Sequence, residues 1–405
     1  MNNNWLRRED ESEYAYIYRI GSIKEQIGSW QDVADLINGQ LGYEYTESKY
    51  RKDYNAFKKM FDANREHFVD TAGQLSDLEE RELALKREAR KFYDQRQALT
   101  RIVTKQARNE ELHDCIAESA ERLNEMFPLL PNPAAAAVST GKNEALLCLT
   151  DWHYGMVCDN IFNRYDTDVC RERVARLRDE VQRRVLLHDV SILHIALLGD
   201  FAHGAIHTTA RVEAKELVSD QLIHVSELLA EFISELSDMV STVNVYATYG
   251  NHMRTVPNKK ENVHEDNMEK IIPWWLEARL VQKENIFFRP SIYEFIYLPI
   301  CGDHICLTHG DLDTVRDFGV TANTLFSRKF GATIDYAIMG DKHHNESLDR
   351  YGIDSIIAPA LCGSDSHANG KRLYAKPAQL MITFRPESGK DAVYHLNFER
   401  RKAVS

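Results

Sequence analysis

The stretch ILHIALLGDFAH, residues 192–203, decides the fold of this chain. Its first seven residues are apolar except for His194, and Gly199 and Asp200 follow at once. An apolar run of this length between helical segments predicts a buried strand. Because α/β folds place their sites at strand ends, the stretch also predicts a functional residue at Asp200.

The same pattern recurs four more times after residue 144. Each time a short apolar run is followed by side chains that can bind a metal. The runs are ALLCLT before Asp151-Trp152-His153, VNVYATY before Gly250-Asn251-His252, HICLT before His309-Gly310-Asp311, and IDYAIM before Gly340-Asp341-Lys342-His343-His344. With helical segments at 168–187 and 212–237, the pattern predicts an α/β domain whose strand ends carry metal ligands.

Aspartate, histidine and asparagine at these strand ends favour one kind of chemistry. Two divalent cations about 3.5–4 Å apart can hold both the attacking and the leaving oxygen of a phosphoryl transfer and can activate a water. The five motifs contain oxygen and imidazole donors but no cysteine. This donor set favours manganese, with iron, magnesium or zinc as alternatives, over a thiolate-bound structural zinc.

The ordered motifs D-x-H, G-D-x-x-H, G-N-H, H-G and G-x-x-H resemble the calcineurin-like metallophosphoesterase superfamily over roughly residues 145–400. The histidine of GDFAH is similar to that of SbcD-type DNA exonucleases, and GNHMRTVPNKKE and LCGSD resemble phage-encoded members. The resemblance implies a four-layer α/β/β/α domain, a metal-dependent phosphoesterase activity and two metal ions.

The resemblance also implies a role for individual residues. The ligands implied for one ion are Asp151, His153, Asp200 and His343, and those for the other are Asp200, Asn251, His309 and Asp341. His252 is implied to stabilise the transition state or to protonate the leaving oxygen, with His203 beside it. The competing interpretation is that both histidines are core residues or hydrogen-bond partners of the ligands.

One position departs from the superfamily pattern. The last motif is normally G-H-x-H, but Asp341 stands here in place of the first histidine. Three interpretations stay open: Asp341 ligates a harder metal, the loop shifts so that His344 is the ligand, or the second site binds metal weakly.

Four residues outside these ligand sets are candidates for contact with the substrate. They are Arg254, Lys259, Lys260 and His344. A lysine or arginine near the metals can hold a phosphate group. The alternative for the lysine pair is an ordinary solvated surface.

The region before the α/β domain is predicted to be helical. Residues 12–70 resemble a helix-turn-helix unit, because glycines at 39 and 42 follow one helical pattern and a second begins after Thr46. The second helix carries the candidate DNA contacts Lys49, Arg51, Lys52, Lys58 and Lys59. A helical hairpin that docks on a partner is the competing interpretation.

Residues 74–127 predict a long connecting helix. Leu78, Leu85, Phe92 and Leu99 are spaced by seven, which indicates a coiled-coil seam. The companion row of the heptad is poor in apolar residues, so the seam either joins two copies in a homo-oligomer, is short, or packs against the body of the protein. Nine basic residues against three acidic ones between 81 and 108 indicate either a phosphate contact or a solvated face. The proline-rich and small residues of 128–143 predict a linker to the domain at 144–400.

Composition limits the classes of function. A net charge of −12 over 405 residues argues against a protein that coats nucleic acid with its whole surface. No run approaches the roughly 20 apolar residues of a membrane helix. Seven scattered cysteines do not form a secreted disulfide framework. These features predict a cytoplasmic protein with no membrane partner.

The leading hypothesis is therefore a dimetal phosphodiesterase that acts as a nuclease on DNA. A phosphatase or phosphodiesterase of small nucleotides or phosphoproteins is one alternative, since the metal site does not fix the leaving group. A DNA- or protein-binding module with a decayed metal site is the other.

Overall fold

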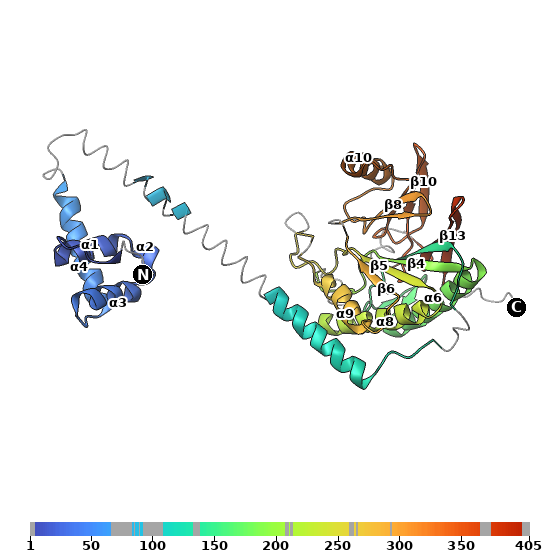
Figure 1. Cartoon of the computed structure of the whole chain (residues 1–405), viewed down its shortest axis with the longest axis horizontal. Coiled ribbons are helices and arrows are strands. Elements are labelled where there is room, and N and C mark those ends of the chain that lie inside the picture. Colours follow the sequence, from blue (N-terminus) through green and yellow to red (C-terminus); the bar gives the residue numbers. More distant parts are fainter. Residues whose placement is uncertain are drawn as a thin grey trace. The chain divides into compact units, whose positions relative to one another are not determined.

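The computed structural model describes residues 5–65, 83–84, 86–88, 90–91, 108–132, 138–206, 210, 214–258, 263–264, 266–291, 294–364 and 374–398. The chain divides into two compact units, Met1–Glu111 and Leu112–Ser405 (Figure 1). The predicted seam residues Leu78, Leu85, Phe92 and Leu99 and the candidates Lys259 and Lys260 lie outside the described residues.

The first unit is a small helical bundle. Its helices are α1 (Glu13–Ser22), α2 (Lys24–Ile27), α3 (Trp30–Leu41) and α4 (Glu47–Ala63). A core containing Tyr16, Ile20, Val33, Ile37 and Tyr50 holds α1, α3 and α4 together. The two predicted helices are thus present, and the turn between them uses Gly42 in the left-handed conformation at φ 72°.

Two sheets form the centre of the second unit. The first sheet has the order β13-β12-β1-β4-β5-β6, and the second has the order β10-β11-β9-β8-β7. The bounds in the first sheet are β1 (Asn143–Leu149), β4 (Val190–Leu197), β5 (Thr242–Ala247), β6 (Ile286–Arg289), β12 (Ala378–Arg385) and β13 (Gly389–Asn397). Those in the second are β7 (Ile296–Ile300), β8 (Asp303–Thr308), β9 (Tyr336–Met339), β10 (Glu346–Arg350) and β11 (Ile353–Ile357). A small ribbon pairs β2 (Cys158–Asp159) with β3 (Arg164–Tyr165).

The strands are buried on both faces because helices cover the outer sides. In β1, Ala145 and Leu147 belong to the core beneath α6 (Thr167–Leu187), α8 (Val218–Ser237) and α9 (Ile271–Arg279), whereas Leu146 and Cys148 belong to the core between the sheets. A third core packs α10 (Phe318–Phe330) on the second sheet. Figure 1 shows α8 and α9 on one side of the unit and α10 on the other. The predicted α/β/β/α order is therefore observed.

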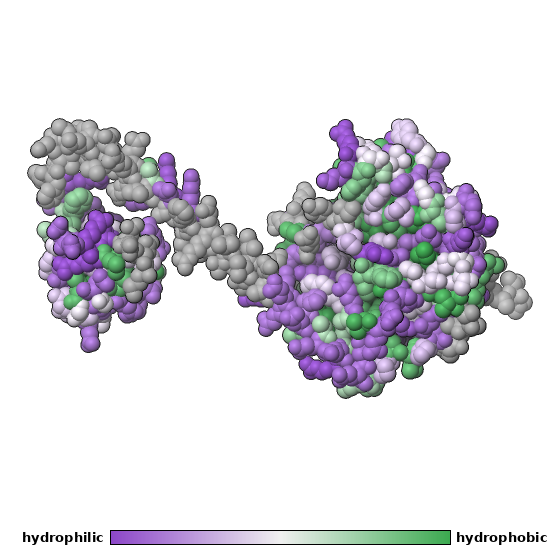
Figure 2. Space-filling model, viewed as in Figure 1, coloured by the Kyte–Doolittle hydropathy of each residue, from purple (hydrophilic) through white to green (hydrophobic). Residues whose placement is uncertain are grey.

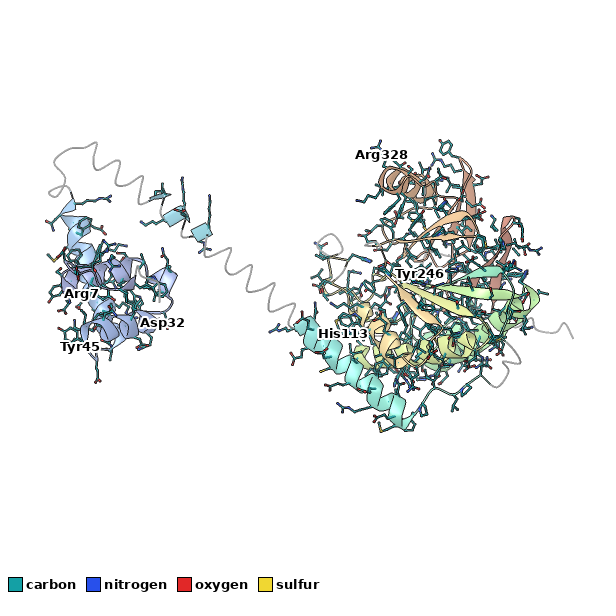
Figure 3. The ribbon with its side chains drawn as sticks, viewed as in Figure 1. Arg7, Asp32, Tyr45, His113, Tyr246 and Arg328 are labelled. Carbon is teal, nitrogen blue, oxygen red and sulfur yellow. The ribbon has the colours of Figure 1, made fainter. Side chains whose placement is uncertain are left out.

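The register of the sheets brings the predicted motifs together. β1, β4 and β5 are parallel neighbours, and so are β8 and β9. Their carboxyl ends therefore lie at one edge of each sheet, and all five motif loops begin there. In the core between the sheets, Tyr246 of β5 is 9% exposed, and Figure 3 labels it inside this unit.

Two boundaries differ from those predicted. The helix predicted for 212–237 begins at Val218, after Leu217 at the N-cap. Residues 112–126 are helical and belong to the second unit, although the sequence assigned them to the connector. They pack there because Ile116 and Ala120 contact the core around Trp275. His113 marks this helix in Figure 3.

In the described part of the chain, no helix combines the length and the apolar character needed to span a bilayer. Figure 2 shows that hydrophilic side chains cover most of the visible surface, with apolar side chains scattered among them.

Candidate metal centre

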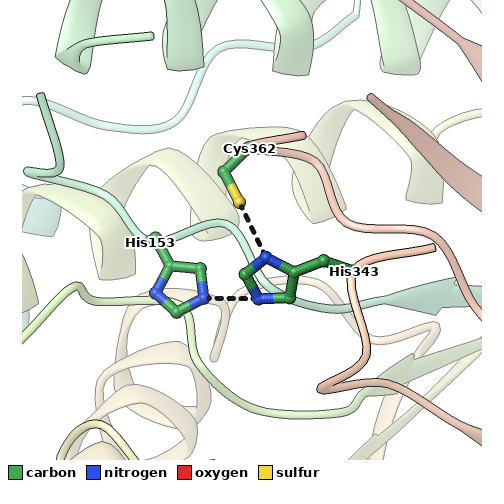
Figure 4. Close-up of side chains that lie close together, drawn as sticks. All are labelled: His153, His343 and Cys362. Atoms are coloured by element: carbon green, nitrogen blue, oxygen red, sulfur yellow. Dashed lines mark hydrogen bonds between the residues drawn. The ribbon is translucent and has the colours of Figure 1, made fainter. Parts of the chain in front are cut away.

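Two imidazoles and a carboxylate converge at the first part of the site, and Figure 4 shows the two imidazoles, those of His153 and His343. Nε2 of His153 lies 3.1 Å from Nε2 of His343, and Oδ1 of Asp151 lies 3.7 Å and 3.4 Å from these two nitrogens. Donor atoms bound to one ion at about 2.0–2.2 Å are themselves about 3–3.5 Å apart. Two of the three distances fall in this range and the third is slightly longer, so the three atoms are close to the spacing of ligands of a common cation.

Asp200 joins this group to a second one. Its carboxylate can bind a metal together with Asp151 and His153, and also together with His309 and Asp341. Oδ2 of Asp200 lies 3.2 Å from Nε2 of His309, which lies 3.6 Å from Oδ1 of Asp341. Asp200 thus belongs to both groups of donors, as a ligand shared by two ions would.

Asn251 lies against the second group. Its Nδ2 donates to Oδ1 of Asp341 at 2.9 Å, so the side-chain amide reaches the same carboxylate that faces His309. A carboxamide supplies the oxygen donor that hard and borderline cations accept. The structure therefore brings together all seven residues that the sequence predicted as ligands.

Hydrogen bonds outside the cluster orient its donors. Nδ1 of His309 donates to the carbonyl of Leu198 at 2.7 Å, which leaves Nε2 to face Asp200. Oδ2 of Asp151 accepts from Thr150 Oγ1 and from the amide of Asp341 at 2.8 Å and 3.0 Å. Its other oxygen, Oδ1, is the one that faces the histidines. Such outer contacts fix the orientation of metal ligands.

The donors shift one another's pKa. Burial alone would raise the pKa of Asp151, but His343 and His153 hold that pKa well below its usual value. Burial would also raise the pKa of Asp200, and here His252 and His309 lower it. The carboxylates are consequently in the ionised form that binds cations.

The backbone is strained at these ligands. Asp151, His153, Asp200, Asp341 and His343 all have positive φ, between 44° and 61°. Residues other than glycine rarely adopt this left-handed region, and clusters of them mark functional sites. Five of the eight such residues found in the described chain belong to the candidate ligands, so the strain is concentrated at this centre.

A dinuclear metal site fits the residues present. No hydrogen bond of good geometry reaches the buried Oδ1 of Asp151 or Nε2 of His309 from the residues that the structure describes. Buried polar atoms of native proteins normally have a partner, and a metal ion can be that partner. Oxygen and imidazole donors in both groups suit manganese, iron or zinc.

His252 and His203 lie beside the ligands. Nδ1 of His252 donates to the carbonyl of His203 at 2.8 Å, and its Nε2 is 4.0 Å from Oδ2 of Asp200. The His203 side chain is buried, and the centre of its ring lies 5.7 Å from the centre of the His153 ring. Both histidines are therefore placed next to the donors, with His252 the more exposed of the two.

The other predicted contacts are placed differently. The guanidinium of Arg254 is buried and donates to the carbonyls of Asn251, Val256 and Pro257 at 2.6, 3.1 and 3.0 Å. These bonds indicate that Arg254 holds the loop together, and they do not favour the predicted contact with substrate. His344 is exposed, bonding to the Lys342 carbonyl and to Glu346, so it lies outside the donor cluster.

Two further residues at the centre are absent from the predicted set of site residues. Sγ of Cys362 lies 3.9 Å from Nδ1 of His343 (Figure 4). Cys362 lies in the loop that follows β11, and a loop after an apolar strand is the same pattern that identified the other motifs. Glu269 is 2% exposed, and its carboxylate accepts from two amides of the ligand loops. Burial, together with the charge of Asp200, raises the pKa of Glu269 to about 7.

The fold and the clustered donors define an α/β protein with a candidate dinuclear metal site. Residues 1–69 match the family model of the YonJ N-terminal domain. The whole chain is similar to the SPbeta prophage-derived uncharacterized protein YonJ of Bacillus subtilis (strain 168). The two are 23% identical over 404 residues, which is 97% of each chain.

Solved structures also resemble the chain. An archaeal phosphodiesterase is 13% identical, with a TM-score of 0.31, over 62% of this chain and 99% of its own. Vacuolar protein sorting 29 of Cryptosporidium parvum is 12% identical, with a TM-score of 0.30, over 64% of this chain and 100% of its own. Zn²⁺-bound Vps29 of Entamoeba histolytica is 12% identical, with a TM-score of 0.27, over 63% and 98%.

Proposed function

We propose that the chain is a dimetal phosphodiesterase that cleaves DNA, with Mn²⁺ as its preferred metal. The observation that carries this proposal is the position of Asp200, whose buried carboxylate belongs to both donor groups. A shared carboxylate between two sets of oxygen and imidazole donors is what a two-metal phosphoryl-transfer site requires.

Asp151, His153 and His343 would hold one ion, and Asn251, His309 and Asp341 would hold the other, with Asp200 shared. When bound, two divalent cations supply Lewis-acid activation of water and offset the charge that develops on the phosphoryl oxygens. The exposure of the side chains indicates how substrate enters, because His343 and Asp341 are 17% and 20% exposed whereas Asp151 and His309 are at most 2% exposed. The phosphodiester would approach from the side of Asp341 and His343.

The protein would contribute its own proton donor in His252. The bond from its Nδ1 to the His203 carbonyl fixes the ring, so Nε2 remains on the side of Asp200. A histidine in this position can protonate the leaving oxygen, and its side chain is 18% exposed. His203 would support this ring through its backbone.

The choice of DNA as substrate rests on the first unit and on the GDFAH motif. Lys52, Lys58 and Lys59 on α4 are exposed, and no ion pair of theirs occurs within the described residues. Lys49 and Arg51 differ, since they pair with Asp53 and Glu47 of the same helix. We infer that the three exposed lysines are the cations of α4 available for phosphate groups.

Substrate preference tests the reaction class. With Mn²⁺, the full chain should cleave single- or double-stranded DNA and should hydrolyse bis(4-nitrophenyl) phosphate faster than 4-nitrophenyl phosphate. Gel assays and absorbance at the nitrophenolate band measure the two reactions. Faster hydrolysis of the monoester would favour the small-phosphoester alternative. Absence of hydrolysis with less than about one bound equivalent of metal would favour the binding-module alternative.

DNA binding by α4 has a separate test. The triple variant Lys52→Gln, Lys58→Gln, Lys59→Gln should bind a duplex more weakly at low salt, because fewer phosphate contacts release fewer counterions. Each lost contact should also reduce the slope of log K against log[salt] by about 0.9. Fluorescence anisotropy in EDTA would measure binding without cleavage. Lys24→Gln is the control, since Lys24 lies on α2 and not on α4, and it pairs there with Glu25. Equal affinity and salt slope in the wild type and the triple variant would remove α4 from the DNA interface.

A further inference from the structure

The segment from Asn267 to Glu269 contacts two of the loops that carry ligands of the second ion, those of Asp200 and Asn251. Oε1 of Glu269 accepts from the amide of Phe201 at 2.5 Å, directly after Asp200. Its Oε2 accepts from the amide of Gly250 at 2.7 Å, directly before Asn251. One carboxylate therefore bridges the backbones of two ligand loops.

Asn267 holds the second of these loops from its other side. Its Nδ2 donates to the carbonyl of Gly250 at 2.7 Å, so both backbone polar groups of Gly250 are bound by the same segment. Oδ1 of Asn267 accepts from the amide of Glu269 at 2.9 Å, and the amide of Met268 donates to the carbonyl of Met253. The geometry of the Gly250 loop thus depends on this short segment.

The segment has a rigid support. Residues Met268–Lys270 form a 3₁₀ turn that continues into α9, and Ile272 and Leu276 of α9 are buried in the core under the first sheet. Gly250 also lies directly against the shared ligand, since a Cβ on it would lie 2.0 Å from Oδ1 of Asp200. A displacement of either loop would consequently change the separation of the ligands.

The position of Glu269 is costly, because its carboxyl group is buried. Its two oxygens contact neutral amides, and no ion pair of Glu269 occurs in the described part of the chain. Burying an uncompensated carboxylate costs several kcal/mol. Burial and the charge of Asp200 accordingly raise the pKa of Glu269 to about 7, and the two loops that its carboxyl group holds account for its place in the fold.

We propose that Glu269 and Asn267 are positioning residues of the metal centre, which set the distance between the Asp200 and Asn251 loops. This inference rests on the proposed dimetal function. Glu269 bonds directly to both loops, so its loss affects the shared ligand Asp200, whereas Asn267 bonds directly to the Asn251 loop and reaches the Asp200 loop through Glu269.

Mn²⁺ titration of the full chain by calorimetry tests the proposal. Glu269→Gln keeps the shape of the side chain but places an NH₂ donor against one of the two amides and removes the charge. Its Mn²⁺ affinity should fall 10- to 100-fold, the usual effect of losing an outer partner of a metal site. Asn267→Ala should weaken one of the two binding events and spare the other. Hydrolysis by Glu269→Gln should recover at high Mn²⁺ concentration.

Glu144→Gln is the matched control. Glu144 accepts from His194 Nε2 and from Cys301 Sγ at the amino end of β1, whereas the ligand loops follow the carboxyl ends of the strands. This variant should lose thermal stability and keep wild-type Mn²⁺ affinity. Wild-type affinity in Glu269→Gln, or an equal loss in Glu144→Gln, would overturn the positioning role, and Asn267→Ala decides the matter if Glu269→Gln does not fold. A wild-type chain that binds no Mn²⁺ would instead overturn the dimetal function itself.

Discussion

Replacing Asp200 with asparagine is expected to abolish metal-dependent phosphodiester hydrolysis. The substitution keeps the size of the side chain and an oxygen that can accept from the His252 amide, a bond of 2.9 Å in the native protein. It removes the negative charge that both donor groups share. Two-metal stabilisation of the transition state contributes several kcal/mol, and about 1.4 kcal/mol corresponds to a tenfold change in rate. We therefore expect kcat/KM to fall by about three orders of magnitude or more.

Metal content separates this effect from a loss of folding. The wild type should bind two equivalents of Mn²⁺ after reconstitution, and Asp200→Asn should bind fewer than one when measured by elemental analysis. Asp335→Asn is the control, because Asp335 accepts the His304 amide at 2.8 Å and lies outside the donor cluster. An Asp200→Asn variant that keeps both metals and a tenth of the activity would contradict the bridging role.

The fold of the second unit was predictable because its strands are buried on both faces. In β4, Ile195 and Leu197 face the helices, while Ala196, together with Leu198 directly after the strand, faces the other sheet. Almost every residue of the run is therefore apolar, and the run stands out from its surroundings. The polar residues that follow such a run are then conspicuous. This is why all seven predicted ligands lie at the centre that the structure shows.

Glu269 could not be found in the same way. It lies in a polar stretch after residue 263 with no apolar run before it, and its partners are backbone amides of Phe201 and Gly250. A hydrogen bond to a distant main chain leaves no trace in the sequence pattern. Arg254 shows the converse case, since a cation near the ligands suggested a phosphate contact although three loop carbonyls use its donors.

The departure at Asp341 also required coordinates. Asp341 and His343 both have positive φ, at 61° and 59°, and this backbone turns both side chains toward the cluster while His344 bonds to Glu346 at its exterior. Local sequence does not specify left-handed conformations at aspartate and histidine. The geometry places Asp341, rather than His344, beside His309.

His252→Gln is expected to have the second largest effect on catalysis, through a different step. Glutamine can still donate to the carbonyl of His203, as Nδ1 of the native ring does at 2.8 Å, but it cannot deliver a proton to a leaving oxygen. General acid catalysis contributes about 10²- to 10⁴-fold, so kcat should fall by that factor with Mn²⁺ stoichiometry unchanged. The loss should be smaller for a diester whose leaving group is 4-nitrophenolate, which departs without protonation.

If His252 had only a structural role, its loss would slow the hydrolysis of both substrates equally, so the dependence on the leaving group tests proton donation. Steady-state rates on DNA and on bis(4-nitrophenyl) phosphate would be compared in the wild type and in His252→Gln. His224→Gln provides the control, because His224 is an exposed residue of α8 that bonds to Glu216 at 2.8 Å. Equal losses on both substrates, or a loss of Mn²⁺, would show that His252 supports the metal centre rather than the leaving oxygen. A selective loss on DNA would assign the proton to its Nε2, the nitrogen that faces Asp200.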